Sequence, residues 1–170
     1  KAAIRQAVRE KAIPYFGFCL GHQLLDDALG GTCERMPAPE VGILDIALTH
    51  AGADDALMAG IPSSFKALQW HGVAVTKTPE GGTALASSPV CAIQAQRVGE
   101  HAWGLQYHVE MTAATAREWG AVPAYGDALG SIMGEGALER FDAECQARMA
   151  EFNAASRTLF RNFLVASGLN

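Results

Sequence analysis

The sequence predicts an α/β domain in which antiparallel hairpins are added to a parallel core, and three observations favour this. An early apolar strand leads through a sharp bend into a helix, which is the building unit of parallel α/β sheets. Short strand-like segments with turn signals between them then fill the middle of the chain. A long amphipathic helix ends it.

The N-terminal part is predicted to be a helix, a buried strand and a second helix. Lys1 to Lys11 has apolar residues at helical spacing, and Ile13 to Phe18 is a short apolar and aromatic run. Helical spacing returns over His22 to Leu29. Gly30-Gly31 then ends that helix, because glycine readily adopts the left-handed conformation of a C-terminal cap.

The remaining elements follow from turn signals and periodicity. Strands are predicted at Val41 to Thr49, Phe65 to Trp70, Val73 to Thr76, Thr83 to Ser87, Cys91 to Val98 and Trp103 to Tyr107. Helices are predicted at Met111 to Trp119 and Ala137 to Val165, with a segment broken by Pro and Gly between them, from Pro123 to Gly136. The last helix carries an apolar stripe that predicts core packing: Leu138, Phe141, Cys145, Met149, Phe152, Leu159 and Phe163.

The composition argues against several classes of function, including nucleic-acid binding, membrane binding and zinc binding. With 170 residues, 49% hydrophobic and 18% charged, the chain fits one globular domain. Its net charge of -5 and lack of a basic cluster argue against nucleic acid or an anionic membrane as partner. Scattered cysteines without a CxxC pair indicate a reducing cytoplasm and no zinc site.

The strongest functional signal is the segment Gly17-Phe18-Cys19-Leu20-Gly21, which has the pattern of a nucleophile elbow. Glycines two positions before and after the nucleophile are expected because side chains there would collide with the neighbouring strand and helix. A cysteine at a helix N-terminus is favoured as a thiolate. The N–H of Leu20 is expected to face the oxyanion that forms on a substrate carbonyl.

A nucleophilic cysteine needs a general base and a group that orients it. His108 is the preferred base because it ends a predicted strand, and Glu110 lies two residues on, on the same side of an extended chain. His71, in a predicted turn between two strands, is the rival candidate, although it has no acidic neighbour in sequence.

Two segments together resemble class I (triad-type) glutamine amidotransferases. Residues 17–23, Gly-Phe-Cys-Leu-Gly-His-Gln, match the family pattern Gly-x-Cys-x-Gly-x-Gln, and residues 104–110, Gly-Leu-Gln-Tyr-His-Val-Glu, resemble Gly-x-Gln-Phe-His-Pro-Glu. The resemblance extends to about Thr112. Within the family, the chain is similar in particular to the amidotransferase domain of guanylate (GMP) synthase and to its stand-alone relatives. The resemblance implies a flavodoxin-like three-layer sandwich with a central, mostly parallel sheet and added antiparallel strands.

The resemblance also implies site residues. The catalytic triad would be Cys19, His108 and Glu110. Glutamine would be held by Gln23, by the backbone around Gly17, Leu20 and Gly21, and by the segment Trp70, His71, Gly72 and Val73. The implied reaction releases ammonia and leaves a glutamyl thioester on Cys19 for water to hydrolyse. Neither a metal nor another cofactor is expected.

The chain departs from the family pattern at Val109, at Val73, where some members carry Asp or Phe, and before Lys1. Val109 replaces a common Pro, which is expected to be tolerable because that Pro mainly stiffens the turn. The family's N-terminal strands, with a Gly-rich loop that supplies a second oxyanion N–H, are not found before Lys1. Residues 1–170 are therefore expected to be a single glutaminase domain that is incomplete at its N-terminus.

Three functional hypotheses remain open from the sequence. The first is glutamine hydrolysis that supplies ammonia to a separate synthase or transferase, since the chain lacks a Gly-x-x-x-x-Gly-Lys-Ser/Thr loop for ATP. The second is a γ-glutamyl peptide or amide hydrolase with the same triad. The third is a non-catalytic binding or regulatory module that kept the fold.

Overall fold

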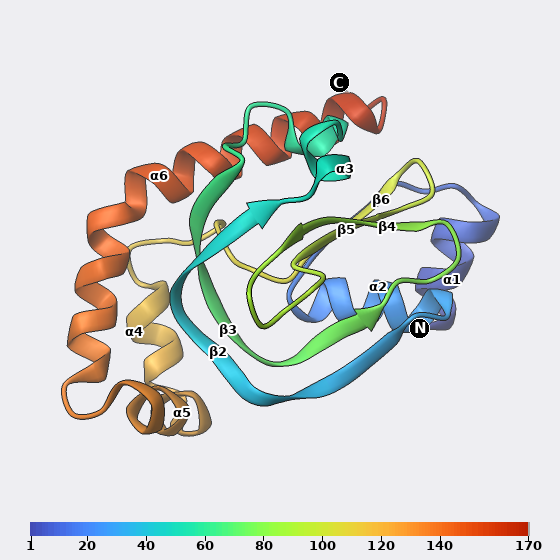
Figure 1. The fold of residues 1–170 in the computed structure, drawn as a ribbon. Coiled ribbons are helices and arrows are strands. Elements are labelled where there is room, and N and C mark those ends of the chain that lie inside the picture. The colour runs from blue at the N-terminus through green and yellow to red at the C-terminus, as the bar shows by residue number, and fades with distance from the viewer. Residues whose placement is uncertain (170) are drawn as a thin grey trace.

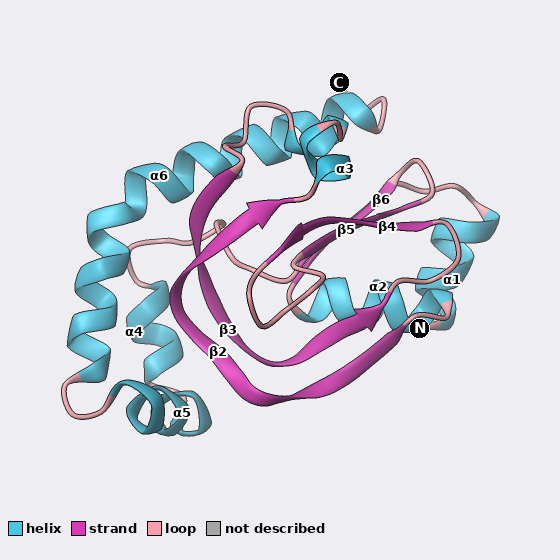
Figure 2. Cartoon of the chain, viewed as in Figure 1, coloured by secondary structure: helices cyan, strands magenta, loops and turns pink. Residues whose placement is uncertain are grey.

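The strand before Cys19 belongs to a six-stranded sheet, which Figures 1 and 2 show curling between helices. The computed structural model describes residues 1–169. The strands are β1 (Tyr15–Phe18), β2 (Thr32–Leu48), β3 (Ser64–Lys77), β4 (Gly82–Ser87), β5 (Ala95–Val98) and β6 (Ala102–Leu105). The helices are α1 (Ala2–Arg5), α2 (Leu20–Leu29), α3 (His50–Ala53), α4 (Thr115–Gly120), α5 (Pro123–Met133) and α6 (Ala137–Ala166), with a π-helical turn at Gln6–Glu10 and a 3-10 turn at Ala56–Met58.

The sheet order is β1-β6-β5-β4-β2-β3. Strands β1 and β6 are parallel, with Gly17 opposite Gly104 and Phe18 opposite Leu105. The other four pairings among the described residues are antiparallel. This is the predicted α/β class with added antiparallel strands, and the parallel pair brings the end of β1 beside the end of β6.

Helices cover both faces of the sheet, as the alternation of side chains along its strands requires. On one face, Leu25 of α2 packs with Ala102 of β6 in a small buried cluster. On the other face, Phe163 of α6 stacks on Phe16 of β1 at 5.1 Å and meets Trp103 of β6 edge-on at 5.9 Å between ring centroids. The result is the predicted three-layer arrangement.

The predictions for the middle strands are partly wrong. Strand β2 begins at Thr32 rather than Val41, and β3 runs without a break through the turn predicted at His71 and Gly72. The pairing of the two strands shifts register between Arg35 and Glu40, in the stretch that contains two prolines. Proline cannot donate to a ladder and is tolerated at such irregularities. The two strands therefore form one long bent ribbon (Figure 1).

The segment predicted to be broken after Pro123 is instead the continuous helix α5. Pro123 occupies its first turn, where a missing N–H costs nothing. A Cβ at Gly126 would lie 2.8 Å from the carbonyl oxygen of Gly120, so this glycine permits close contact with the end of α4. Gly134, at φ 76°, ends the helix. These glycines allow packing and capping rather than break the helix.

The apolar stripe of α6 packs on the core as predicted. Phe152 is 1% exposed, whereas Phe160 on the same helix is 56% exposed. We expect Phe152→Ala to lower the free energy of unfolding by about 3–5 kcal/mol, because it leaves a cavity. Phe160→Ala is the matched control and should change it by less than about 0.5 kcal/mol. Urea unfolding measures both values, and equal losses would contradict the assignment of the buried stripe.

Within residues 1–169, none of the helices combines the length and the apolar character needed to span a bilayer.

Candidate active site

Cys19 occupies a strained turn between β1 and α2. Its backbone angles are φ 45° and ψ -102°, in a region that residues other than glycine rarely adopt. Such strain costs on the order of 1–3 kcal/mol and persists only where the surrounding structure enforces it. The sharp strand-to-helix bend predicted at this position is confirmed.

The crowding expected at the two flanking glycines is found at one of them. A Cβ on Gly17 would lie 2.6 Å from the backbone carbon of Gly21, so any side chain would force the turn open. At Gly21 the nearest atom to a Cβ would be the Tyr15 hydroxyl oxygen at 3.5 Å, an ordinary contact. The prediction of a collision at Gly21 is therefore wrong, because Gly17 alone faces the opposite backbone.

The backbone of the elbow is fixed against β6. The N–H of Cys19 donates to the carbonyl oxygen of Leu105 at 2.7 Å, and its carbonyl accepts from the N–H of Gln23 at 3.1 Å. Leu20 begins α2, so the helix offers its N–H no carbonyl partner one turn earlier. This leaves a backbone donor beside the thiol, where an oxyanion would form.

His108 lies on the segment that follows β6 and pairs with Leu68 of β3 through two backbone hydrogen bonds, of 2.9 and 3.2 Å. Its Nδ1 is 2.6 Å from Oε1 of Glu110. The other carboxylate oxygen of Glu110 accepts from the N–H of Val109 at 2.9 Å. Trp119 packs edge-on against the imidazole, 4.8 Å between ring centroids. Glu110 and Trp119 thus hold the ring, and the pairing with Leu68 fixes the backbone of His108.

The electrostatics favour an imidazolium at His108. Burial lowers the pKa of His108, but hydrogen bonds with Cys19 and Glu110 and the negative charges of both groups outweigh burial and raise the pKa to about 9. Burial opposes ionisation of Glu110, yet the hydrogen bond and charge of His108 hold the pKa of Glu110 below its ordinary value. Cys19 and His108 thus line one pocket, and Glu110 is the hydrogen-bond partner of His108.

The raised pKa of His108 predicts a pH dependence of stability. An unfolded histidine has a pKa near 6.5, so proton binding at His108 stabilises the fold fully below about pH 6.5. That contribution is lost as pH rises through about 9. We expect the free energy of unfolding, measured with urea from pH 6 to 9, to fall with pH in the parent protein. A His108→Gln variant should lack this part of the decline, and an identical decline would contradict the assignment.

A pocket of about 290 Å³ opens at the thiol. It is lined by Phe18, Cys19, Leu20, Trp70, His108, Trp119 and Tyr125. A neighbouring pocket of about 450 Å³ shares Trp70 and Tyr125 and is otherwise lined by Arg35, Pro39, Val41, His71, Gly72, Val73, Ala124 and Ala128. Cys19 thus faces a small aromatic-walled space with a second space adjoining it.

The residues predicted to hold glutamine do not all lie at the same pocket. Trp70 lines the pocket at Cys19, whereas His71, Gly72 and Val73 line only the adjoining one. The side-chain amide of Gln23 donates to the carbonyl oxygen of Val73 at 2.9 Å, so it is engaged within the protein. Trp70 and the elbow residues Cys19 and Leu20 therefore line the same pocket. His71, Gly72 and Val73 line the adjoining pocket instead.

Sequence reasoning missed the partner of His71. Glu40, distant in sequence, lies with its Oε2 3.0 Å from Nε2 of His71, and both side chains are buried. Oε1 of Glu40 accepts a hydrogen bond from Ser88 at 2.7 Å, and Oε2 accepts one from Gln94 at 2.8 Å. No local pattern could reveal this pair, because it depends on the unexpected N-terminal extension of β2. His71 therefore contacts Glu40 and does not line the pocket at the Cys19 thiol.

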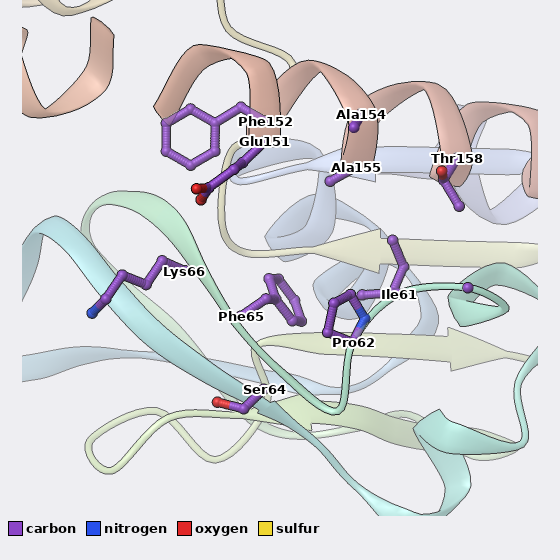
Figure 3. A pocket seen from close by; sticks show the side chains of 11 residues that line it. Ile61, Pro62, Ser64, Phe65, Lys66, Glu151, Phe152, Ala154, Ala155 and Thr158 are labelled. Atoms are coloured by element: carbon purple, nitrogen blue, oxygen red, sulfur yellow. The ribbon is translucent and has the colours of Figure 1, made fainter. Parts of the chain in front are cut away.

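A further pocket, of about 380 Å³, lies between α6 and the start of β3. Figure 3 shows Phe65 and Ile61 facing Phe152 and Ala155 across it. None of the predicted site residues lines this space. Among residues 1–169, no three His, Cys, Asp or Glu side chains are grouped to hold a metal ion.

A strained cysteine elbow beside a His–Glu pair, at the end of parallel strands, defines an α/β protein with the apparatus for nucleophilic catalysis. A family model described as glutamine amidotransferase class-I matches residues 1–119. The chain belongs to this family. The resemblance noted in the two sequence segments is thereby confirmed.

Curated relatives are glutamine-hydrolysing GMP synthases. The chain is 32% identical over 105 residues to one subunit of the Sulfolobus acidocaldarius enzyme, and the match covers 61% of this chain and 54% of that subunit. It is 36% identical over 98 residues to the Aeropyrum pernix GMP synthase, covering 58% of this chain and 19% of that protein. The chain thus spans about half of the first relative and a fifth of the second.

Solved structures agree with the fold. A glutamine amidotransferase from Thermotoga maritima matches with a TM-score of 0.82 and 25% identity, over 95% of this chain and 66% of that one. A glutamine amidotransferase from Methylobacillus flagellatus matches with a TM-score of 0.80 and 27% identity, over 97% and 67%. The flavodoxin-like class I amidotransferase fold predicted from the sequence is confirmed.

Proposed function

We propose that this protein hydrolyses the side-chain amide of glutamine to glutamate and ammonia. Cys19 attacks the amide carbon as a thiolate, and the N–H of Leu20 donates to the oxyanion that develops. His108 gives its proton to the departing nitrogen, which leaves as ammonia. Water, deprotonated by His108, then hydrolyses the glutamyl thioester. Glu110 orients His108 and stabilises its charged form throughout.

The observation that carries the proposal is the convergence of the elbow and the His–Glu pair on one pocket. Cys19 and His108 line the same pocket, and Nδ1 of His108 lies 2.6 Å from Oε1 of Glu110. The pocket at the thiol is at the small end of ligand-pocket volumes, ~300–1,000 Å³, which suits an amino acid. These features support catalysis over a purely regulatory module, which would not need an ionised His beside a thiol.

We also propose that the ammonia passes to a separate synthase or transferase protein in the cytoplasm. The support is that the relatives include one subunit of a glutamine-hydrolysing GMP synthase. Neither a metal nor a cofactor is needed for the hydrolysis.

A second candidate is hydrolysis of a γ-glutamyl peptide or amide. The adjoining pocket favours it, because a substituent on the amide nitrogen could extend past Trp70 and Tyr125 toward Arg35. The same thioester chemistry applies, with an amine leaving in place of ammonia.

Parallel assays of glutamate and ammonia test the two candidates. The full-length protein should release both products in equal amounts from glutamine. Greater kcat/KM on γ-glutamyl peptides than on glutamine would instead favour the second candidate. Glutamate release from neither class, with or without a synthase partner, would contradict both.

A further inference from the structure

Gln106 is a buried residue that contacts the nucleophile. It directly follows Leu105, whose carbonyl holds the Cys19 backbone, and its own N–H donates to the carbonyl oxygen of Gln94 at 2.8 Å. The side chain is fully buried, and its Nε2 lies 3.5 Å from the sulfur of Cys19, within hydrogen-bond distance for sulfur. The amide nitrogen therefore faces the reacting atom.

The direction of this amide is set by its neighbours. Nε2 of Gln23 donates to the carbonyl oxygen of Val73 at 2.9 Å, and a carbonyl can only accept. The same Nε2 lies 3.1 Å from Oε1 of Gln106, so that oxygen is the acceptor. With its oxygen committed to Gln23, the Gln106 amide must present its NH2 group to Cys19.

The carbonyl of Val73 that begins this chain of hydrogen bonds is itself fixed. Nδ1 of His71 lies 2.9 Å from it, so this ring nitrogen must carry a proton. The opposite ring nitrogen lies 3.0 Å from Oε2 of Glu40, and both side chains are buried. Hydrogen bonds from His71, Ser88 and Gln94 outweigh the burial of Glu40 and lower the pKa of its carboxyl group. The chain of hydrogen bonds therefore ends beside a buried carboxylate, that of Glu40.

We propose that Gln106 is a further catalytic residue, whose side-chain N–H stabilises the Cys19 thiolate, and that Gln23 is the positioning residue that orients it. The inference rests on the proposed thiol chemistry. A donor to the charged form of an acid favours ionisation, and donors to charged groups are the stronger ones. Gln106 then contacts the sulfur as a neutral donor, whereas His108, on the same pocket, acts as an acid.

The distinction between the two contacts matters for the reaction. His108 must release its proton to the leaving group and recover it, so its charge changes during turnover. Gln106 keeps its protons and holds the thiolate in the free enzyme. The other titratable groups at this pocket are Tyr125 of α5 and, behind the imidazole, Glu110. Glu110 does not substitute for a fixed N–H donor, because it only accepts while it is ionised.

The pH profile of Cys19 alkylation tests the inference without any substrate. Iodoacetamide labelling of the full-length protein is followed at Cys19 by peptide mass spectrometry. Burial raises the pKa of the Cys91 thiol to about 11, so Cys91 should label later. We expect Gln106→Met, which removes the donor at similar size, to raise the midpoint by about one pH unit. Labelling below the midpoint should then be about tenfold slower.

Two more variants complete the test. Gln23→Met should raise the midpoint by a smaller amount, because the Gln106 amide is then free to turn. Gln96→Met is the matched control, since Gln96 is an equally buried glutamine on β5 whose amide faces His22, and its midpoint should equal that of the parent. Thermal unfolding identifies any variant that has lost its fold. If Gln106→Met does not fold, the alkylation midpoint of Gln23→Met tests the inference in its place.

The outcomes separate this inference from the proposed function. Raised midpoints in Gln106→Met or Gln23→Met, with Gln96→Met unchanged, support the inference. Unchanged midpoints in the folded variants overturn it and leave the glutaminase proposal intact. If Cys19 of the parent is not labelled selectively at all, the proposed function fails and this inference with it.

Discussion

Cys19→Ala is expected to reduce glutamate release from glutamine by about 10⁴-fold or more, because no thioester can form without the sulfur. The alanine removes one atom at the mouth of a pocket and leaves the His108–Glu110 hydrogen bond untouched. The variant should therefore stay folded and still bind glutamine. Coupled assays of glutamate and ammonia measure the rate, and glutamine binding by calorimetry checks the pocket.

A matched cysteine separates this effect from general damage. Cys33 is a half-buried free thiol near the other end of α2, and burial raises its pKa to about 11. Cys33→Ser should retain the parent rate within a few fold. Substantial hydrolysis by a folded Cys19→Ala protein would contradict the covalent mechanism and point to direct attack by water.

His108→Gln is the second large effect, and we expect it to lower kcat by about 10³-fold or more. Glutamine retains a group that can hydrogen-bond to Glu110, but it cannot accept and return a proton. The pH profile of Cys19 alkylation should change as well, since an imidazolium would no longer face the sulfur. Initial rates at saturating glutamine measure the first effect, and iodoacetamide labelling measures the second.

An exposed histidine provides the control for that substitution. The side chain of His50 is 99% exposed at the start of α3, so His50→Gln should leave both the rate and the alkylation profile unchanged. A His108→Gln variant that keeps the parent rate would remove His108 from the mechanism and leave the source of the proton to be found elsewhere.

The elbow was predictable because its signal is local. Cys19 lies between Gly17 and Gly21, after an apolar run and before helical spacing. This pattern predicts a sharp strand-to-helix turn, and Cys19 adopts the strained backbone conformation of such a turn. The His108–Glu110 pair was predictable for the same reason, since two residues in an extended segment share a side of the chain.

The long-range features were not predictable from the sequence. The pairing of Glu40 with His71 depends on a strand that contains two prolines, a composition that argues against strand. The role of α5 in the pocket, through Tyr125, depended on a segment whose glycines indicated a break. In both cases tertiary packing determined the local conformation, although the local preferences of proline and glycine disfavour it.

The backbone angle of Cys19 has a consequence for how this protein balances stability against activity. Glycine accepts φ 45° without the steric penalty that a Cβ brings, so position 19 is held by a residue that the fold itself disfavours. Selection for thermal resistance alone would be expected to replace it, and would do so by removing the sulfur. At position 19, improved thermostability and retained chemistry are thus mutually exclusive, and gains in stability must come from elsewhere in the fold.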